Sequence, residues 1–202
     1  SVMNKAVDLM KGQSKYKGMV IYNEDQNFCV GANLGLVTMA TKVKLWPFVS
    51  WFIRKGQKTF MNMKYADAPI VGAPSGMALG GGCEVLLHCN ALTAHAETYV
   101  GLVEAGVGLV PAWGGCKELV GREAHKKGQT NTGPMAGPLK AFEAIATAQV
   151  ATSAKEARDM NILRDGDDVI MNRDRVLQSA KDKVLELAKD FKNPEPFVYR
   201  PA

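Results

Sequence analysis

The sequence predicts an α/β fold in which short buried strands alternate with helices. Residues 17–22 and 69–73 form short apolar runs, and prolines bound the second run, which is typical of a buried strand. Residues 2–10 and 172–191 instead carry their apolar side chains at helical spacing. Strands interleaved with helices predict a layered architecture. No internal sequence repeat is evident.

The first half contains the longest helical pattern. From residue 37 to residue 63 large apolar residues recur at helical spacing, and Pro47 marks the start or a kink of a second helix within this stretch. Residues 76–82 are rich in glycine and lead into an apolar run of helical character at 83–89. Residues 91–94 are expected to form a further strand.

The second half begins with an apolar stretch, 99–111, that is broken by glycines. A helix is expected at 114–120, and 121–138, which is rich in Gly, Lys and Pro, is expected to be a flexible loop. Three helices follow. The second of them begins at Ser153, because Glu156 three residues later completes a capping box.

Composition is that of an ordinary soluble globular chain of about one domain, with 47% hydrophobic and 22% charged residues. The formal net charge is +5, and residues 1–65 hold ten Lys and Arg against three acids. Such an excess suits an anionic partner such as a phosphorylated cofactor, and a solvated basic face with no partner would have the same sequence. Because no zinc-finger or RNA-binding motif is present, no nucleic-acid partner is expected.

Membrane and secretory signals are missing from the sequence given. The most apolar stretch, 43–53, contains Lys44 and Pro47 and is far shorter than the roughly 20 residues that cross a bilayer. No secretory signal is recognisable, and the four cysteines show no C-x-x-C spacing. We therefore expect a soluble protein with reduced thiols and a cytoplasmic location.

The glycine-rich window 76–82 is the most informative local feature. Three consecutive glycines at its end precede a helix, where they allow positive φ angles and a close approach of backbone N–H groups to a bound atom. N–H groups at a helix N-terminus favour a developing negative charge. A tight strand-to-helix turn without a ligand would have the same sequence. No P-loop lysine follows Gly82 and no G-x-G-x-x-G fingerprint exists, so NAD binding by that motif is excluded.

Two carboxyl groups lie in apolar surroundings. Glu84 follows the glycines in the first helical turn, where the helix dipole alone also favours an acid. Glu104 is the one charged residue of the sequence 99–111, and a carboxyl among Val, Leu and Gly has a raised pKa unless it points into water. Two such carboxyls beside a backbone-amide site are suited to moving protons around an enolate.

Other catalytic arrangements are disfavoured. His88, His95 and His125 show no metal-ligand spacing, so no metal site is expected, and His88 in its apolar helix is expected to belong to the core. No G-x-S-x-G nucleophile elbow exists, because alanine stands two residues before Ser75. Hydrolysis through a Ser–His acyl-enzyme is therefore not expected.

In three ordered blocks the sequence resembles the enoyl-CoA hydratase (crotonase) family. The blocks are 28–33 (FCVGAN, where the family usually ends in Gly-Ala-Asp), 76–84 (GMALGGGCE) and 101–111 (GLVEAGVGLVP). The resemblance covers most of the chain. The region 37–63 and the tail 148–191 are most similar to the hydratase portion of bacterial fusions with 3-hydroxyacyl-CoA dehydrogenase.

The resemblance implies hydration of a trans-2-enoyl-CoA to a 3-hydroxyacyl-CoA in fatty acid β-oxidation. The N–H groups of Ala32 and Gly81 would form an oxyanion hole for the thioester carbonyl. Glu84 would act as base towards a water held between the two glutamates, and Glu104 would deliver a proton to Cα. No cofactor is implied, because CoA enters as part of the substrate, and NAD would serve only a dehydrogenase domain fused elsewhere.

Further positions follow from the same resemblance. Gly31, Asn33 and Gly80 are expected to contact the substrate, and the N–H of Ala112 is expected to contact the water. Asn33 replaces the usual aspartate, and Ala112 stands where glycine is common, so its Cβ narrows the site. The basic first third would face the phosphates of CoA. The apolar segment 43–53 would line the acyl pocket or form an ordinary core or trimer contact.

The implied fold is the crotonase (ClpP-like) ββα superhelix. Residues 1–145 would form the crotonase core, without the opening strands that precede its first helix in the family and help to bind CoA. Residues 146–202 would form a C-terminal helical region for trimerisation and capping. The family implies a homotrimer or a dimer of trimers.

Three alternatives remain open. A Δ3,Δ2-enoyl-CoA isomerase needs only one carboxyl. This sequence has acids at both 84 and 104, which favours hydration. A non-catalytic fragment of a fused 3-hydroxyacyl-CoA dehydrogenase would bind acyl-CoA without turning it over. A ClpP-like peptidase would need a serine and a histidine that this sequence lacks at the corresponding places.

Overall fold

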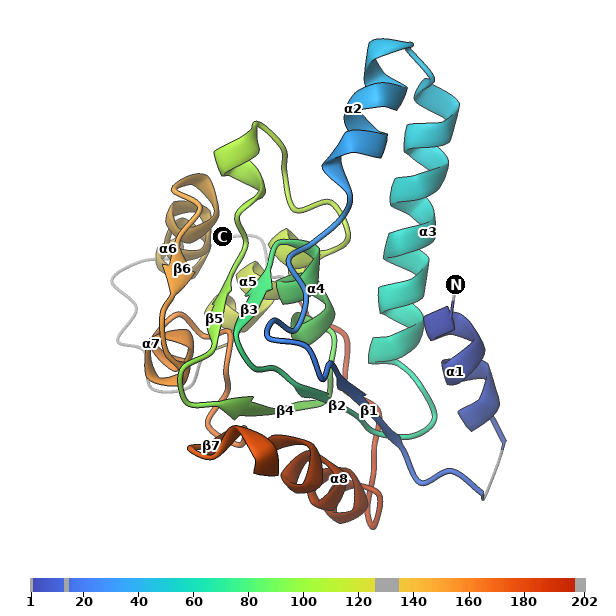
Figure 1. The fold of residues 1–202 in the computed structure, drawn as a ribbon, viewed down its shortest axis with the longest axis vertical. Helices are drawn as coiled ribbons and strands as arrows, with labels where there is room; N and C mark the ends of the chain where they lie inside the picture. The colour runs from blue at the N-terminus through green and yellow to red at the C-terminus, as the bar shows by residue number, and fades with distance from the viewer. Residues whose placement is uncertain (1, 13–14, 126–134, 199–202) are drawn as a thin grey trace.

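Two small sheets form the centre of the molecule, and helices surround them (Figure 1). The computed structural model describes residues 2–12, 15–125 and 135–198. Within these ranges the first sheet is parallel throughout, with the strand order β1 (Met19–Tyr22), β2 (Ile70–Ala73), β4 (Ala91–His95) and β7 (Asp168–Ile170). In the second sheet β5 (Tyr99–Gly101) pairs in parallel with β3 (Met77–Leu79) and antiparallel with β6 (Val150–Ala151).

Helices make up most of the remaining described chain. The α-helices are α1 (Val2–Met10), α2 (Leu34–Lys42), α3 (Trp46–Lys64), α4 (Gly81–Leu87), α5 (Gly115–Ala124), α6 (Ala136–Ala146), α7 (Ala154–Asp159) and α8 (Val176–Leu187). Two short 3-10 helices, η1 (Glu104–Val107) and η2 (Arg173–Arg175), precede α5 and α8.

The path of the chain repeats although its sequence does not. β2, β3 and α4 form one turn, and β4, β5, η1 and α5 form the next. The strands of the two turns pair in parallel, with Val71 opposite Ala91 in the first sheet and Met77 opposite Tyr99 in the second. The turns therefore stack into the ββα superhelix that was predicted from the resemblance.

Apolar cores lie on both faces of the first sheet. Because side chains alternate along a strand, Ile70 and Val71 belong to different cores. α8 covers the Val71 face with Val176, Ala180 and Val184, which are spaced by four residues and so share one side of the helix. The Ile70 face belongs to the larger core, to which α1, α3 and α4 contribute.

α2 and α3 form a hairpin whose tip projects away from the sheets (Figure 1). The Oδ1 of Asn33 accepts a hydrogen bond from the Gly35 N–H at 3.0 Å and so caps α2. Pro47 lies in the first turn of α3, where its missing N–H costs no helical hydrogen bond. Of the two sequence-based options for Pro47, the start of a second helix is therefore confirmed.

Most predicted elements are confirmed to within about two residues, but the loop predicted for 121–138 is wrong at both ends. α5 continues to Ala124 and α6 begins at Ala136, while residues 126–134 lie outside the described residues. The end of α5, after the helix predicted for 114–120, was not predicted because charged residues occupy its buried face. Arg122, for example, is 7% exposed and donates a hydrogen bond of 2.7 Å to the carbonyl oxygen of Leu87.

The three helices expected after 121–138 are present as α6, α7 and α8. Residues 146–198 also supply β6 and β7 to the two sheets, and the trimerisation and capping role of this region stays a prediction. The helix predicted at 172–191 begins later, at Val176, because a 3-10 turn capped by Asn172 comes first. The helix start predicted at Ser153 is confirmed, since the Ser153 Oγ accepts a hydrogen bond from the Glu156 N–H at 3.2 Å. The Glu156 carboxylate accepts from the Thr152 N–H at 2.7 Å, so the reciprocal bond of the capping box goes to the residue before the cap.

Candidate active site

Three segments of the chain end side by side at one edge of the second sheet. β3 and β5 run in parallel, with Leu79 opposite Gly101. Cys29 forms a further parallel bridge with Ala78. Because parallel segments end at the same edge, the residues that follow them are brought together. The residues that follow are Ala32 after the first segment, Gly81 and Glu84 after β3, and Glu104 after β5.

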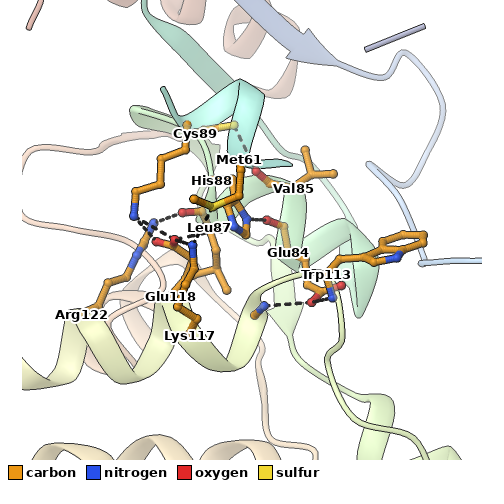
Figure 2. Close-up of polar contacts among 12 residues, drawn as sticks. Met61, Glu84, Val85, Leu87, His88, Cys89, Trp113, Lys117, Glu118 and Arg122 are labelled. Atoms are coloured by element: carbon orange, nitrogen blue, oxygen red, sulfur yellow. Dashed lines mark hydrogen bonds and ion pairs between the residues drawn. The ribbon is translucent and has the colours of Figure 1, made fainter. Parts of the chain in front are cut away.

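Glu84 is held rigidly in the first turn of α4, and its side chain points to the segment that precedes α5 (Figure 2). It is 2% exposed, and its Oε1 accepts hydrogen bonds from the backbone N–H groups of Trp113 and Gly115, both at 2.9 Å. Burial raises the pKa of Glu84 to about 7 against the opposing effect of these N–H groups, and the neighbouring Glu104 raises it further. A group with this pKa exchanges protons readily near neutral pH.

Glu104 begins η1, directly after β5. Burial raises its pKa, against a smaller opposing effect of its own N–H and that of Val103. Its Oε2 is enclosed and has no hydrogen-bond partner among the described residues. An enclosed carboxylate oxygen without a donor is costly, which agrees with the raised pKa of Glu104.

Two backbone N–H groups are available beside these carboxyls. Gly81 is the first residue of α4, so its N–H has no acceptor within the helix, and the Ala32 N–H makes no hydrogen bond within the described part of the chain. Gly31 and Gly80 precede them with φ angles of +98° and +55°, which favour glycine. A Cβ at Gly81 would lie 3.7 Å from the Cα of Gly31, so the two segments are in contact.

A cavity of about 390 Å³ opens where the α2–α3 hairpin faces the ends of β3 and β5. Its walls are largely apolar and come from both helices of the hairpin and from residues 103–113. The predicted site residues that line it are Gly31, Ala32, Gly80, Gly81, Glu84, Glu104 and Ala112. The structure thus gathers both carboxyls and both amide-bearing segments at one apolar cavity.

Asn33 and Ala112 occupy less direct positions. Asn33 is not among the residues that line the cavity, because its side chain caps α2. Ala112 lines the cavity, and its carbonyl oxygen accepts a hydrogen bond of 2.8 Å from the Nε2 of Gln57. The N–H of the next residue, Trp113, donates to Glu84. The predicted contacts of Asn33 with substrate and of the Ala112 N–H with water stay predictions.

Trp113 is a site residue that the sequence reasoning missed. Its indole lies against the rings of Phe52 and Phe60, with centroid separations of 5.2 and 5.6 Å. A Cβ at Gly56 would overlap the indole, and a Cβ at Gly81 would lie 3.1 Å from its Cζ3. Trp113 therefore fills the space between α3 and the start of α4. No local sequence signal marks it, since these contacts join distant parts of the chain.

The basic residues of α3 lie away from this cavity. Arg54, Lys55 and Lys58 line a separate surface depression together with Trp51, and the Lys55 Nζ lies 4.4 Å from the centre of the Trp51 ring. Residues 49, 52 and 53, on the other side of the helix, line the cavity. The predicted contact of the basic first third with CoA phosphates stays a prediction.

Neither a metal-binding cluster nor a membrane-spanning helix is present within the described ranges. Among the described residues, no group of three or more His, Cys, Asp or Glu side chains could hold a metal ion. No helix within the described part is long and apolar enough to cross a membrane. All four cysteines are free thiols.

A sequence profile described as "Enoyl-CoA hydratase/isomerase" matches residues 2–151. The chain belongs to the enoyl-CoA hydratase/isomerase family. The crotonase resemblance carried by the three ordered blocks is thereby confirmed.

Relatives with curated names include members of this family that are longer than the chain. The chain is 44% identical over 179 residues to a Bacillus subtilis protein named "Probable 3-hydroxyacyl-CoA dehydrogenase", an alignment that covers 89% of the chain and 22% of the relative. It is 29% identical over 203 residues to the human mitochondrial methylglutaconyl-CoA hydratase, covering 100% of the chain and 53% of the relative. The chain thus spans about a fifth of the length of the Bacillus subtilis relative and about half of the length of the human one.

Solved structures of the enoyl-CoA hydratase/isomerase family confirm the fold. The enoyl-CoA hydratase from Bacillus anthracis superposes with a TM-score of 0.74 at 20% sequence identity, covering 94% of this chain and 65% of that one. An enoyl-CoA hydratase from Geobacillus kaustophilus superposes with a TM-score of 0.76 at 17% identity, covering 93% and 63%. The described architecture is therefore the crotonase fold.

Proposed function

We propose that this chain hydrates trans-2-enoyl-CoA thioesters to 3-hydroxyacyl-CoA in fatty acid β-oxidation. The observation that carries the proposal is the meeting of Glu84, Glu104 and the N–H groups of Ala32 and Gly81 at one apolar cavity. Membership of the enoyl-CoA hydratase/isomerase family supports CoA thioester chemistry in general. The two carboxyls favour hydration within that chemistry.

The proposed reaction begins with the thioester carbonyl. Its oxygen accepts hydrogen bonds from Ala32 and Gly81, and these stabilise the negative charge that develops when water adds to the double bond; one such donor is worth about 3–4 kcal/mol in comparable sites. The α4 N-terminus, to which Gly81 belongs, adds a favourable dipole. The thioester therefore becomes an enolate in a site that is arranged for it before binding.

The two glutamates then divide the proton transfers. Glu84, with a pKa of about 7, takes one proton from water as the water oxygen bonds to Cβ. Glu104 gives a proton to Cα and so converts the enolate into the 3-hydroxyacyl thioester. Proton exchange between the carboxyls and solvent restores the starting state. Water is added across the double bond and nothing is oxidised or reduced.

The apolar walls supply the place for the acyl group. Side chains of α2 and α3 such as Val37, Val49 and Phe52 line the cavity, so an acyl chain would be buried there away from water. We propose the CoA moiety as part of the substrate and no separate cofactor. The name of the Bacillus subtilis relative supports a fusion with a dehydrogenase, which would use NAD and oxidise the product of hydration. Trimeric assembly and a cytoplasmic location are parts of the same proposal.

Assays of Glu84→Gln and Glu104→Gln on crotonyl-CoA test the mechanism. Each substitution removes one proton-transfer group and is expected to lower kcat for hydration by about 10²- to 10⁴-fold. The loss of absorbance of the enoyl thioester measures the rate. Glu97→Gln is the matched control, because Glu97 is exposed and absent from the cavity, and it should hydrate at the parental rate.

The outcome also separates the alternatives. Hydration at the parental rate by either cavity variant would overturn the two-carboxylate mechanism. If the parental chain instead converts a 3-enoyl-CoA faster than it hydrates crotonyl-CoA, and one glutamate is dispensable, the activity is that of an isomerase. Binding of acyl-CoA without turnover of either substrate would identify a non-catalytic domain.

A further inference from the structure

His88 lies directly behind Glu84, outside the residues that line the cavity (Figure 2). It caps the C-terminal end of α4, one helical turn after Glu84, and is 1% exposed. Its ring packs beside Phe60 of α3, with a centroid separation of 5.3 Å. The proposed proton transfers do not use this imidazole, so its burial next to the base needs another explanation.

One contact of His88 fixes the backbone of Glu84. The last carbonyl groups of a helix lack intrahelical partners, and in α4 the Glu84 carbonyl oxygen lies 2.7 Å from the His88 Nδ1. A carbonyl oxygen only accepts, so Nδ1 carries the proton and donates it to this bond. The neutral tautomer is thereby defined, with the lone pair on Nε2. The imidazole holds the main chain of the residue whose side chain is the proposed base.

A second contact of His88 fixes the donors to the Glu84 side chain. Gly114 has a φ of +117°, and a Cβ there would lie 2.8 Å from both Cε1 and Nε2 of His88, so its backbone rests on the ring. Gly114 stands between Trp113 and Gly115, whose N–H groups bind the Glu84 carboxylate. The ring therefore contacts both the main chain of Glu84 and the 113–115 turn. The separation of these two segments sets the lengths of the hydrogen bonds that the Glu84 carboxylate accepts.

Buried charged groups lie beside the far side of the ring. The His88 Nε2 lies 3.6 Å from the Glu118 Oε1, is itself enclosed and makes no hydrogen bond in the described residues. Glu118 is bound by the Nζ of Lys64 and of Lys117, each at 2.8 Å. Burial lowers the pKa of His88 to about 4 despite the nearby Glu118 carboxylate, so the ring stays neutral at physiological pH. His88 acts through its shape and its one N–H.

We propose that His88 is a positioning residue for Glu84, which holds the Glu84 main chain and the 113–115 turn at a fixed separation. The inference rests on the proposed function, because it concerns the base of that reaction. Loss of His88 lets the turn move relative to α4, so the two N–H bonds that favour the Glu84 carboxylate weaken. The pKa of Glu84 then rises and the base is misplaced with respect to the water.

Comparison of His88→Asn with His88→Gln isolates the contact. The asparagine amide can place an N–H near the position of Nδ1, whereas the glutamine amide places it near Nε2. For His88→Gln we expect kcat for crotonyl-CoA hydration to fall about 10- to 100-fold, as for a small misplacement of a catalytic group, with KM within about twofold. The acidic limb of its pH profile should move to higher pH by about one unit. His88→Asn should recover most of both changes.

A matched control is present in the same chain. The Nδ1 of His125 binds the carbonyl oxygen of Gly121, four residues earlier, at 2.8 Å in α5. This is the same local contact, and His125 does not line the cavity. His125→Gln should therefore leave the pH profile and kcat unchanged. If the loss of any helix-capping histidine changed the activity, His125→Gln would change it as well.

A titration that needs no turnover keeps this inference separate from the proposed function. The Glu84 side-chain carboxyl can be followed by ¹³C NMR over pH, with Glu84→Gln to assign its signal. A raised Glu84 pKa in His88→Gln, and recovery in His88→Asn, would support the positioning role even if crotonyl-CoA is not hydrated. Equal Glu84 titration in parent, His88→Asn and His88→Gln would overturn it, whatever the hydration rates.

Discussion

At the scale of a single residue, Gly80 connects the two halves of the candidate site, the Glu104 carboxyl and the Gly81 N–H. Its φ of +55° and ψ of −121° lie in a region open to glycine and strained for other residues. A Cβ there would also lie 3.2 Å from the Glu104 Oε1. The bare backbone at Gly80 thus allows the Glu104 carboxyl to approach the start of α4, where the Gly81 N–H is presented.

Gly80→Ala is expected to damage stability and activity together. Backbone strain of this kind costs on the order of 1–3 kcal/mol, and the new methyl group would push the Glu104 carboxyl out of place and lower kcat for hydration. Urea unfolding and a crotonyl-CoA assay measure the two effects. Gly12→Ala is the control for strain alone, because Gly12 has a φ of +60° with no atom within 4 Å of its Cβ position. Equal kcat in both variants would contradict the proposed contact.

The residues of the site differ in how far the sequence could predict them. Glu84 and Glu104 were predictable because each is a carboxyl within a local apolar block, and the order of the blocks linked them. Trp113 and His88 act through contacts with segments that are distant in sequence, Trp113 with α3 and His88 with the turn before α5. Such contacts exist only in the folded chain, so no local pattern indicates them.

At the scale of an element, the helix α3 sets the position of Trp113. Gly56 gives the indole room to lie against the helix between Phe52 and Phe60. The backbone N–H of the same tryptophan donates to Glu84. Close packing of α3 on the Trp113 indole therefore also affects Glu84, the proposed base, which the Trp113 N–H binds.

Gly56→Ala is expected to be destabilising although alanine favours helices more than glycine does. The added methyl overlaps the indole, and overpacking of this kind costs about 1–3 kcal/mol. Trp113→Phe should relieve part of that cost, because the smaller ring leaves space. A double-mutant cycle by urea unfolding measures the coupling between the two sites. Additive effects would show that Gly56 and Trp113 do not compete for the same space.

Elements with their own sequence periodicity were predictable, whereas those made by pairing were not. α1 and α3 repeat apolar residues at helical spacing, and β2 is a short apolar run, so each was expected from the sequence. β3, β6 and β7 have two or three residues each, too few to display a period. They become strands because the superhelix places a neighbouring strand beside them.

At the scale of the whole molecule, the fold places groups of opposite pH response in one buried region. Burial raises the pKa of Glu84 to about 7, and burial lowers that of His88 to about 4. For Glu84 the folded state binds the proton more tightly than the unfolded state, so stability is lost as pH rises from about 4.5 to 7. For His88 the unfolded state binds the proton more tightly, so stability is lost as pH falls from about 6.5 to 4.

The opposing slopes predict that the parental chain changes little in stability across the window where both groups act, and that Glu84→Gln uncovers the hidden dependence. One pKa unit corresponds to about 1.4 kcal/mol. The free energy of unfolding of Glu84→Gln minus that of the parent should therefore increase by about 2 kcal/mol between pH 5 and pH 7.5. Groups that do not interact with Glu84 are shared and cancel in this difference.

Urea unfolding of both proteins at four or five pH values measures that difference. A flat difference for Glu84→Gln would mean that Glu84 is ionised in the folded chain at pH 5. That result would contradict the near-neutral pKa of Glu84, because both this pKa and the pH dependence of stability arise from the burial of the same carboxyl.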